Sequence, residues 1–415
     1  MLKFTAINLP FYISSRLIKS DNNAKKFTKP VIKISILAIT LGIAVMILAM
    51  AVVNGFQKEI RNKVSGFTGH YQVSAYSSQE TIESTPIDIH QDFYPGIEKL
   101  PEVKHIQVYA YKPAIIKVNG EIYGIVTKGV AQDFDWQFFE NNMTEGTVFK
   151  ANPDKPDNKI VISKYIADKL KLHTGEKIYV YFVQQDGSLR PKDFEISGIY
   201  NTGLEHYDKA IALIDIAHIR KRNKWTNDQV GGFEIYLSDF DLLDKAYEKI
   251  YEEIPYDLNM ASLRDKNPEI FNWLELQDVN VVIIIVLMIV VAAINIISAL
   301  FILILEKVNF IGIMKALGAG NMLIRKVFLI QASYLILKGM VWGNIIGIGL
   351  ALLQKHFQLI KLPQESYYVD TVPIDISVLQ ITLINIITFA LCYVVLLLPS
   401  WVITKISPVK SIRFN

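Results

Sequence analysis

The sequence predicts an α-helical membrane protein with four transmembrane helices plus a large α+β periplasmic domain inserted between helices 1 and 2. Three observations predict this fold. The chain of 415 residues is 51% hydrophobic yet 20% charged, which is typical of a membrane part and a water-exposed part in one chain. Four stretches are long and apolar enough to cross a bilayer, which takes about 20 residues. Between the first two lies a polar block, residues 54–278, which is long enough to bury its own core.

The four transmembrane helices are predicted at 31–53, 279–305, 327–353 and 376–403. The first has a basic flank and an A-x-A pattern at Ala49–Ala51, as in a cleaved signal peptide, but its apolar run exceeds the roughly 7–15 residues of such signals. We therefore expect a retained helix. In the arm before it, residues 1–30, "NLPFYISSRLIKS" is expected to form an amphipathic elbow helix along the membrane surface. A disordered basic tail is the alternative.

The distribution of lysine and arginine predicts the orientation in the membrane. Residues 55–278 contain 26 Lys and Arg against 35 Asp and Glu, whereas the rest of the chain contains 17 against 5. The arm, the segment 306–326 and the tail 404–415 are basic, so we expect them in the cytoplasm. The acidic block and the loop 354–375 are expected on the opposite face.

The only cysteine, Cys392, lies in an apolar run, so no intrachain disulfide is possible. An outer block without cysteine suits the oxidising bacterial periplasm. The predicted localisation is the bacterial inner (cytoplasmic) membrane, as a multi-pass protein with both termini cytoplasmic.

The outer block predicts a mixed fold. "NGFQKEIRNKV" is expected to extend the first membrane helix as a stalk, and "HYQVSAY" alternates like a strand. "IDIHQDFYPGIEKL" predicts a helix interrupted near Pro95. "HIQVYAYKPAIIKVNGEIYGIVTKGV" predicts strands with a hairpin turn at Asn119–Gly120. "FEIYLSDFDLLDKAYEKIYEEI" predicts a strand, a cap at Ser238 and an amphipathic helix. Together these segments predict a porter-like α+β subdomain, about 54–130 and 230–278.

The part between them, about 131–229, predicts a β-rich insert. It contains a short helix, "SKYIADKLKL", and two strands around a polar turn from residue 184 to 192. The tip of this hairpin is a candidate partner-binding site, with an ordinary solvated turn as the alternative. Its candidate residues are Gln184, Gln185, Arg190, Pro191 and Lys192.

The sequence contains no sign of catalysis by this chain. None of its 22 glycines is followed by Lys-Ser or Lys-Thr, so there is no phosphate-binding loop. No H-E-x-x-H and no Cys/His spacing suits zinc. "GLEHYDK" clusters Glu205, His206 and Asp208, but adjacent loop residues rarely converge on one ion, and we expect no metal. A net charge of +3 gives no case for nucleic-acid binding.

The segment "EKVNFIGIMKALGAGNMLIRKVF" predicts a short helix between the second and third membrane helices. Its large apolar residues fall on one helical face, Gly318 supplies a stop, and Asn321 can cap the next helix. We expect a knob that docks in a cleft of a cytoplasmic protein, with an interfacial turn as the alternative. The candidate coupling residues are Glu306, Phe310, Ile313, Met314, Lys315, Leu317 and Gly318.

The third membrane stretch carries two further features. Gly339, Gly343 and Gly347 repeat every four residues, which predicts a close-packing face, although a membrane helix also simply tolerates glycine. Lys338 lies well inside the apolar run. Either it makes a polar contact or its amine reaches the interface.

Several motifs resemble those of the FtsX/MacB superfamily of ABC transporter permeases. "EKVNFIGIMKALGA" resembles the motif that follows the second helix in that superfamily. "SILAITLGIAVMILAMAVVNGFQKEIRNKVSGFTGH" is similar to the first helix and stalk of the Lol-type lipoprotein-releasing permeases (LolC/LolE family), whose V-M-N-G-F signature appears at residues 52–56 as V-V-N-G-F. "GIYNTGLEHYDKAIALI" and the tail "ISPVKSIRFN", with Lys410 where an acid is usual, also resemble that subgroup. The likeness covers nearly the whole chain.

The resemblance implies a permease subunit that works as a dimer, with a second copy or a paralogue, on two copies of a separate ABC ATPase. ATP and Mg are bound by the ATPase, which grips the knob, and the stalk helices relay its closure to the outer domains by mechanotransmission. A lipoprotein enters from the outer leaflet and passes to a periplasmic lipoprotein carrier, with the 184–192 hairpin in the place of the carrier-binding hook. The alternatives are an FtsX-like mechanotransmitter that controls a cell-wall hydrolase, and a MacB-like efflux permease.

Overall fold

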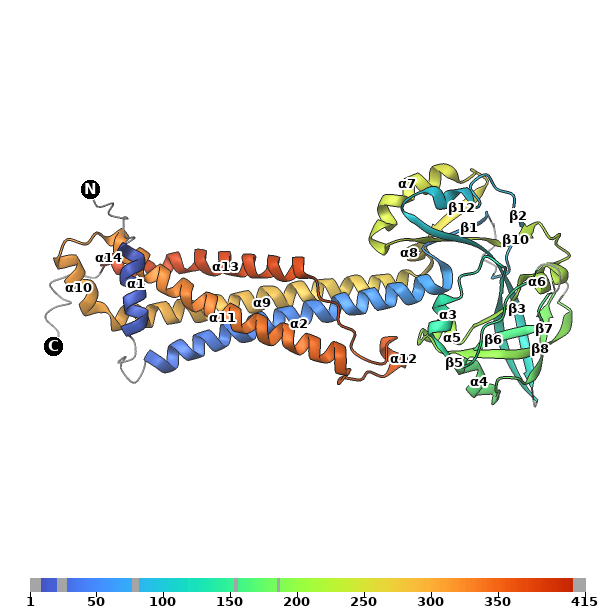
Figure 1. Cartoon of the computed structure of the whole chain (residues 1–415), viewed down its shortest axis with the longest axis horizontal. Coiled ribbons are helices and arrows are strands. Elements are labelled where there is room, and N and C mark those ends of the chain that lie inside the picture. The colour runs from blue at the N-terminus through green and yellow to red at the C-terminus, as the bar shows by residue number, and fades with distance from the viewer. Residues whose placement is uncertain are drawn as a thin grey trace, which may run out of the picture. The chain divides into compact units, whose positions relative to one another are not determined.

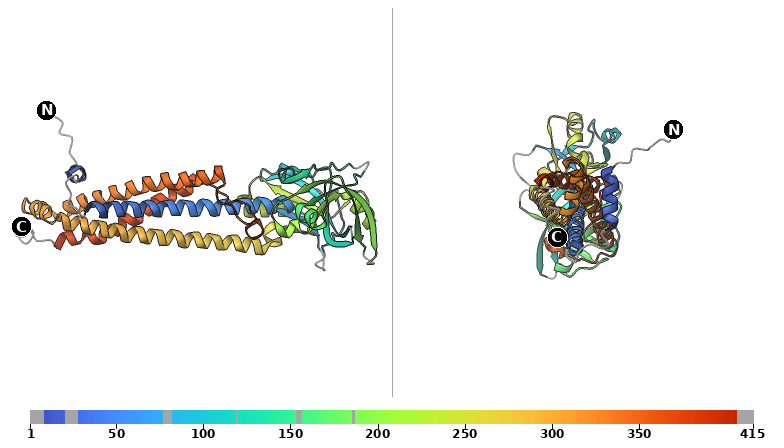
Figure 2. Two further views of the ribbon diagram at one scale, coloured as in Figure 1. Left: turned by 90° about the horizontal axis from the view of Figure 1, so that it is seen from below. Right: turned by 90° about the vertical axis from the view of Figure 1, so that its left-hand side faces the viewer.

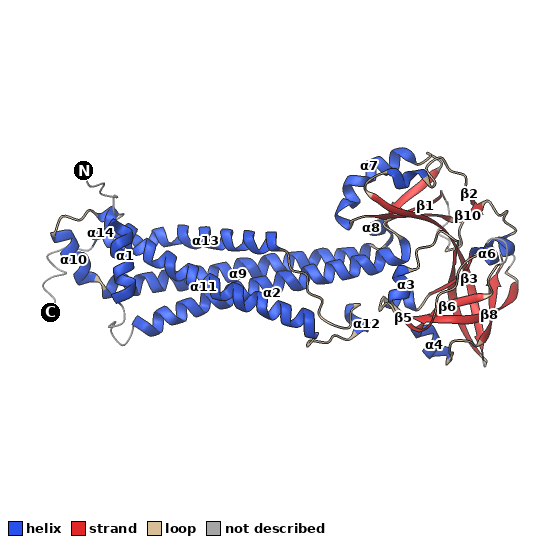
Figure 3. Ribbon diagram, in the orientation of Figure 1, coloured by secondary structure: helices blue, strands red, loops and turns tan. Residues whose placement is uncertain are grey.

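The computed structural model describes residues 9–20, 28–76, 82–118, 120–152, 156–184 and 187–405. The chain divides into two compact units. The membrane unit comprises the described residues of 1–57, 273–361 and 371–415, and the α/β unit comprises those of 58–272 and 362–370. Figure 3 shows that the membrane unit is built of helices and that the strands belong to the α/β unit.

Four helices in the described part of the chain are long and apolar enough to cross a membrane, as the sequence predicts. They are labelled in Figure 1 as α2, α9, α11 and α13. The helices that lie wholly or partly in the membrane unit are α1 (Leu9–Ser20), α2 (Thr28–Thr68), α9 (Pro268–Glu306), α10 (Val308–Ala316), α11 (Asn321–Phe357), α13 (Val378–Ser400) and α14 (Val402–Lys405).

Two of the long helices continue beyond the predicted membrane spans. α2 runs without a break to Thr68, so the predicted stalk is confirmed, and the division between the units falls inside it, after Gln57. α9 already begins at Pro268, and the division again falls inside the helix, after Asn272. Each of these helices therefore belongs to both units.

The predicted elbow helix is present as α1, although residues 1–8 and 21–27 of the arm lie outside the described residues. α1 packs against α11 and runs across the long helices (Figures 1 and 2). Ser14 is fully buried, whereas the ring of Phe11 is exposed. An exposed apolar surface of this kind is typical of helices that lie in the membrane interface.

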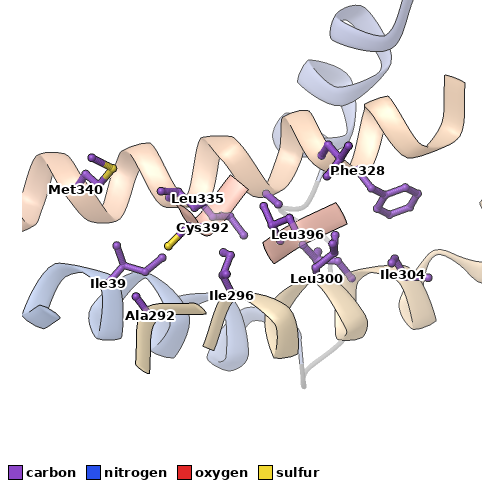
Figure 4. Packing of buried hydrophobic residues seen from close by; sticks show 14 of the residues in the cluster. Ile39, Ala292, Ile296, Leu300, Ile304, Phe328, Leu335, Met340, Cys392 and Leu396 are labelled. Carbon is purple, nitrogen blue, oxygen red and sulfur yellow. The ribbon is translucent and has the colours of Figure 1, made fainter. Parts of the chain in front are cut away.

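The core of the membrane unit is a cluster of mainly aliphatic side chains, to which all four long helices contribute. Figure 4 shows Ile39, Ile296, Leu335 and Cys392 gathered in it. The thiol of Cys392 is free and buried. Lipid tails are as apolar as these side chains, so close packing and interhelical hydrogen bonds, rather than exclusion of water, hold such a bundle together.

The α/β unit is built on a ten-stranded mixed sheet with the order β12-β1-β11-β3-β4-β9-β6-β8-β5, in which β7 pairs with β3 and β8. A separate small sheet pairs β2 with β10. The strands are β1 (Tyr71–Ala75), β2 (Ile87–Asp88), β3 (Val103–Val118), β4 (Glu121–Val130), β5 (Met143–Gly146), β6 (Lys159–Ser163), β7 (Lys177–Val183), β8 (Leu189–Tyr200), β9 (Ile211–Asp215), β10 (Gln229–Val230), β11 (Gly232–Leu237) and β12 (Leu258–Ser262).

The α/β unit also contains short helices, of which all but α12 lie in the chain segments around these strands. They are η2 (Gly96–Lys99), α3 (Gln137–Asn141), α4 (Lys164–Leu170), α5 (Glu205–Asp208), α6 (Ile216–Asn223), η3 (Phe240–Leu242), α7 (Leu243–Glu253), α8 (Leu263–Lys266) and α12 (Gln364–Tyr367). The predicted helix in "SKYIADKLKL" is confirmed as α4, and the hydroxyl of Ser163 accepts a hydrogen bond from the amide of Ile166 at its N-terminus.

The long strand β3 joins the two halves of the sheet, because it pairs with β11, β4 and β7. The predicted boundary near residue 130 does not divide the sheet, since β4 pairs in parallel with β9 of the expected insert. The predicted hairpin between β3 and β4 is confirmed by the pairing of Val118 with Glu121. Gly120 has a φ of +84°, which glycine adopts without strain, and Asn119 lies outside the described residues.

Two local predictions in the α/β unit are wrong. No long helix spans 87–100, because Ile87–Asp88 pairs with β10, and Pro95 and Gly96 both disfavour an α-helix and leave only the short η2. Asp239, not Ser238, caps the segment after β11, since its carboxylate accepts from the amide of Asp241. The hydroxyl of Ser238 instead donates to the carbonyl of Glu102 at 3.2 Å.

Candidate coupling site and its connections

The turn between α9 and α11 contains a short helix, α10, as the sequence predicts. Leu317 follows as the C-cap of α10. Gly318, directly after it, has a φ of +89° that favours glycine. Asn321 is the first residue of α11 and Gly320 occupies the N-cap position, so the predicted cap by Asn321 is wrong.

The predicted coupling residues divide between the two sides of α10. Ile313 is 52% exposed and Leu317 is 79% exposed. Met314 is only partly exposed and packs against the core of the membrane unit, next to the fully buried Ile311. Phe310 is also partly buried. The most exposed apolar anchors of the turn are therefore Ile313 and Leu317, with Met314 holding the helix in place.

Charged residues in the turn and at the start of α11 bind this region to neighbouring helices. The amine of Lys315 donates to the carbonyl of Ile403 at 2.8 Å, and that of Thr404 lies at 3.4 Å. The guanidinium of Arg325 donates to the hydroxyl of Ser400 at 3.1 and 3.2 Å. Glu306 lies 3.9 Å from the amine of Lys307. The turn is thus fixed to the end of α13 and to α14, while the side chains of Ile313 and Leu317 remain exposed.

The candidate hairpin differs from its prediction. Arg190, Pro191 and Lys192 lie within β8, where they pair with β7, rather than in the turn. The guanidinium of Arg222 donates to the carbonyl of Pro191 at 2.9 Å. Gln184 accepts a turn hydrogen bond from the amide of Gly187, and Gln185 lies outside the described residues. The strands extend further than the polar composition suggested, because the backbone pairing reaches Leu189.

Near the end of its apolar stretch, α2 is bound to three other segments of the membrane unit. The amide of Asn54 donates to Gln380 of α13, and that of Gln57 donates to Asp278 of α9 at 2.7 Å. A Cβ atom on Gly55 would lie 2.3 Å from the carbonyl oxygen of Pro373, so only glycine fits. The Asn-Gly-Phe-Gln sequence was visible as a motif, but the role of its side chains depends on partners remote in the sequence.

The end of α2 in the α/β unit is bound to the sheet by a buried ion pair. The amine of Lys128 on β4 lies 2.8 Å from the carboxylate of Glu234 on β11, and both side chains are fully buried. The same amine donates to the carbonyl of Phe67, in the last turn of α2. Gln107 and Gln72 donate to the carboxylate of Glu234 at 2.9 and 3.2 Å.

This arrangement satisfies a carbonyl at the end of the helix, where no helical amide follows. Sequence reasoning missed Lys128 and Glu234. The available signal was one charged residue inside each of two apolar strands, in "IVTKGV" and "FEIYL".

Comparison with known protein families decides the identity of the chain. A family model described as the MacB-like periplasmic core domain matches residues 34–252, and one described as the FtsX-like permease C-terminal matches residues 282–408. The chain belongs to the FtsX/MacB superfamily of ABC permeases. It is therefore a multi-pass inner-membrane protein with a periplasmic domain.

The relatives of this permease include proteins with Lol names. The lipoprotein-releasing system transmembrane protein LolC of Neisseria meningitidis is 25% identical, over 98% of this chain and 100% of its own length. LolC of Xylella fastidiosa (strain Temecula1) is 24% identical, over 92% and 93% of the two chains. LolE of Haemophilus influenzae is 24% identical, over 97% and 99%. The similarity therefore extends over both units of the permease.

The glycine face of the permease packs α11 against α2. A Cβ atom on Gly343 would lie 2.6 Å from the Cβ of Ile43 and 2.8 Å from the carbonyl of Thr40, and Gly339 and Gly347 are similarly tight. The hydroxyl of Thr40 also donates to the carbonyl of Gly339 at 3.1 Å. Lys338, next to this face, is exposed on α11.

We expect Gly343→Leu to prevent assembly of the membrane unit, because the helices would have to separate. The measurement is the yield of monodisperse protein after detergent extraction, together with its thermal stability. Gly349→Leu is the matched control on the same helix, since its Cβ would meet nothing within 4 Å. If the two variants had equal yields and stabilities, close packing of α11 against α2 at Gly343 would not be needed for assembly.

The "GLEHYDK" segment serves the structure of its own loop. The carboxylate of Asp208 accepts from the hydroxyl of Thr202 at 2.7 Å and from the amide of Gly203 at 2.9 Å. Glu205 instead pairs with Lys209, one turn along the chain. In the part of the chain that the structure describes, no three His, Cys, Asp or Glu side chains are placed to hold a metal ion.

We expect His70 to make the α/β unit sensitive to acid. Its ring is buried, and Nδ1 accepts from the amide of Leu237 at 3.1 Å. The pKa of His70 is lowered from 6.5 to about 4, mainly by burial; Asp239 opposes the shift and Lys104 adds to it. The unfolded chain therefore takes up this proton first as the pH falls.

We expect the stability due to neutral His70 to be complete above pH 6.5 and to be lost between pH 6.5 and about 4, by about 3 kcal/mol. The measurement is the unfolding free energy of the α/β unit in the full chain as a function of pH. His70→Gln keeps an acceptor but does not titrate, so it should have a smaller loss. The same loss in both proteins would assign the acid sensitivity to other groups.

Proposed function

We propose that this chain is the permease subunit of an ABC complex that extracts lipoproteins from the outer leaflet of the inner membrane and passes them to a periplasmic carrier. The observation that carries the proposal is the unbroken helix α2, which belongs to both the membrane unit and the α/β unit. Relatives named lipoprotein-releasing system proteins align along nearly the whole chain and support the same function.

The proposed mechanism is mechanical. A separate ATPase, which binds ATP and Mg, takes Ile313 and Leu317 into a cleft, and its closure moves α10. Lys315 and Arg325 pass this movement to the ends of α13 and α14, and the closely packed helices pass it to α2. The end of α2 is bound to the sheet through Lys128, so the α/β unit moves with it.

An energy source is required because acyl chains must leave the bilayer. Exposing them to water costs about 0.8 kcal/mol per CH₂ group. A periplasmic carrier with an apolar site lowers this cost, and the hairpin of β7 and β8 is the proposed contact for it. In the proposed topology both termini and α10 are cytoplasmic, the α/β unit is periplasmic, and a second permease copy or paralogue completes the dimer.

Two alternatives share this mechanical design. The match to the MacB-like periplasmic core domain also fits an efflux permease, and the match to the FtsX-like C-terminal segment also fits a mechanotransmitter that controls a cell-wall hydrolase. The three functions differ in the periplasmic partner, which would be a lipoprotein carrier, an efflux adaptor or a hydrolase.

The test is depletion of this chain followed by fractionation of the membranes. Lipoproteins should accumulate in the inner membrane, and a lipid-binding carrier should copurify with the complex. Normal lipoprotein sorting together with a copurified hydrolase or adaptor would overturn the proposal. The topology is checked in a Cys392→Ala chain with a membrane-impermeant maleimide. Lys117→Cys should react in intact spheroplasts, and Asn309→Cys should react only after lysis.

A further inference from the structure

The loop between α11 and α13 is divided between the two units. Its ends, up to Lys361 and from Thr371, belong to the membrane unit, whereas its tip, Leu362–Asp370, belongs to the α/β unit. Apart from α2 and α9, this loop is where the described chain passes from one unit to the other. We call it the strap.

The ends of the strap are firmly bound within the membrane unit. The side chain of Gln354, in the last turn of α11, accepts from the amide of Ile360 at 3.0 Å and donates to the carbonyls of Ile360 and Val372 at 3.3 and 3.2 Å. The amide of Asp375 donates to the carbonyl of Ala51 on α2 at 3.0 Å. Both arms of the strap therefore move with α2 and α11.

The tip is bound just as specifically within the α/β unit. The amine of Lys63, on the stalk part of α2, donates to the carbonyl of Tyr368 at 2.9 Å. Asn201 donates to the side-chain oxygen of Gln364 at 3.4 Å. The amide of Leu362 donates to the carbonyl of Asp370 at 2.8 Å and closes the neck of the tip.

Gly203 leaves room for this contact. Its φ is +77°, and a Cβ atom there would lie 2.1 Å from the amide nitrogen of Gln364. The loop that carries Gly203 is in turn fixed by Asp208, which accepts from its amide at 2.9 Å. The "GLEHYDK" segment thus forms part of a socket for the tip of the strap.

The side chain of Lys63 is largely buried among charged groups, which suits a fixed contact rather than a free surface amine. It is 9% exposed, and three carboxylates, Glu59, Asp370 and Asp208, act on it. Burial lowers the pKa of Lys63, and these carboxylates oppose that shift. One of them, Asp370, belongs to the tip itself, so charge and hydrogen bonding both hold the tip against the stalk.

We propose that the strap is a third mechanical link between the membrane unit and the α/β unit, alongside α2 and α9, with Lys63 and Gln364 as the positioning residues that hold its tip. A third link adds a restraint on rotation about these two continuous helices. The role of the strap in lipoprotein release rests on the proposed function, but the restraint itself does not.

The test uses the full chain in lipid nanodiscs, in a Cys392→Ala background with spin labels at two exposed positions, Tyr179 of the α/β unit and Val378 of the membrane unit. The combined variant Lys63→Met and Gln364→Ala should broaden the distribution of distances between the labels. The control is Tyr367→Ala, an exposed residue on the same helix α12, which should leave the distribution unchanged. An unchanged distribution in the double variant would overturn the proposal.

A second experiment keeps the proposal testable if the double variant folds poorly. Asn201→Cys and Gln364→Cys, joined by a short reducible bifunctional thiol reagent, fix the tip in its socket. If the tip stays bound throughout the cycle, the crosslink changes nothing, so lipoprotein release by the complete complex should persist. Release that stops on crosslinking and returns on reduction would show that the tip must detach. If the distance distribution broadens while lipoprotein release stays normal, the strap is a mechanical link but has no part in the proposed function.

Discussion

Lys128→Met is expected to lower the free energy of unfolding of the α/β unit by about 3–5 kcal/mol. The substitution leaves the carboxylate of Glu234 fully buried without its cation, and it leaves the carbonyl of Phe67 at the end of α2 without this donor. A buried charge that loses its partner costs far more than a surface charge does, because neither water nor a counterion replaces the contact.

Hydrogen exchange of the full chain measures this effect locally. Amides of β4, β11 and the last turns of α2 should lose protection together, since one network holds them. Lys117→Met is the matched control, because Lys117 is exposed on β3. Unchanged protection in Lys128→Met would mean that the ion pair adds nothing to the junction.

The double variant Lys128→Met and Glu234→Leu separates the charge effect from packing. Removing both charges should recover part of the lost stability, since no unpaired ion remains. Recovery should be incomplete, because Gln107 and Gln72 each lose the carboxylate to which they donate. A double variant that is less stable than Lys128→Met alone would contradict this explanation.

Long apolar runs and strong local patterns could be predicted from the sequence. The four membrane helices, the stalk, the β3–β4 hairpin and α4 depend on periodicity, length and turn residues, which are local properties. The helix expected at 87–100 failed because pairing of β2 with β10 decides that segment, and the pairing partner lies far along the chain.

The connections between elements could not be predicted for the same reason. Lys128 and Glu234 are 106 residues apart, Gln57 and Asp278 are 221 apart, and Lys63 and Tyr368 are 305 apart. Nothing in the local pattern of a strand or helix identifies such partners. The sequence likewise predicted that α10 is amphipathic, but which apolar residues face the bundle depends on its packing against that bundle.

The difference in exposure among the apolar residues of α10 and its C-cap determines the expected result at the coupling site. Leu317→Arg should abolish binding of the separate ATPase by the permease while leaving the thermal stability of the permease unchanged, because Leu317 is 79% exposed. Interface hot spots cost about 2 kcal/mol or more when removed, or roughly a 30-fold loss of affinity. An arginine in a desolvated cleft adds the cost of an unpaired charge.

Two neighbouring variants distinguish binding from folding at the same helix. Met314→Arg should weaken ATPase binding and also lower the thermal stability of the permease, since Met314 packs against the core of the membrane unit. Lys315→Ala should be milder than either, because it removes only the contacts with the carbonyls of Ile403 and Thr404. The measurement is the affinity of the ATPase for each detergent-solubilised variant, with the melting temperature recorded in parallel. If Leu317→Arg binds the ATPase as tightly as the unmodified chain, the exposed side of α10 is an interfacial turn and the ATPase binds elsewhere on the permease.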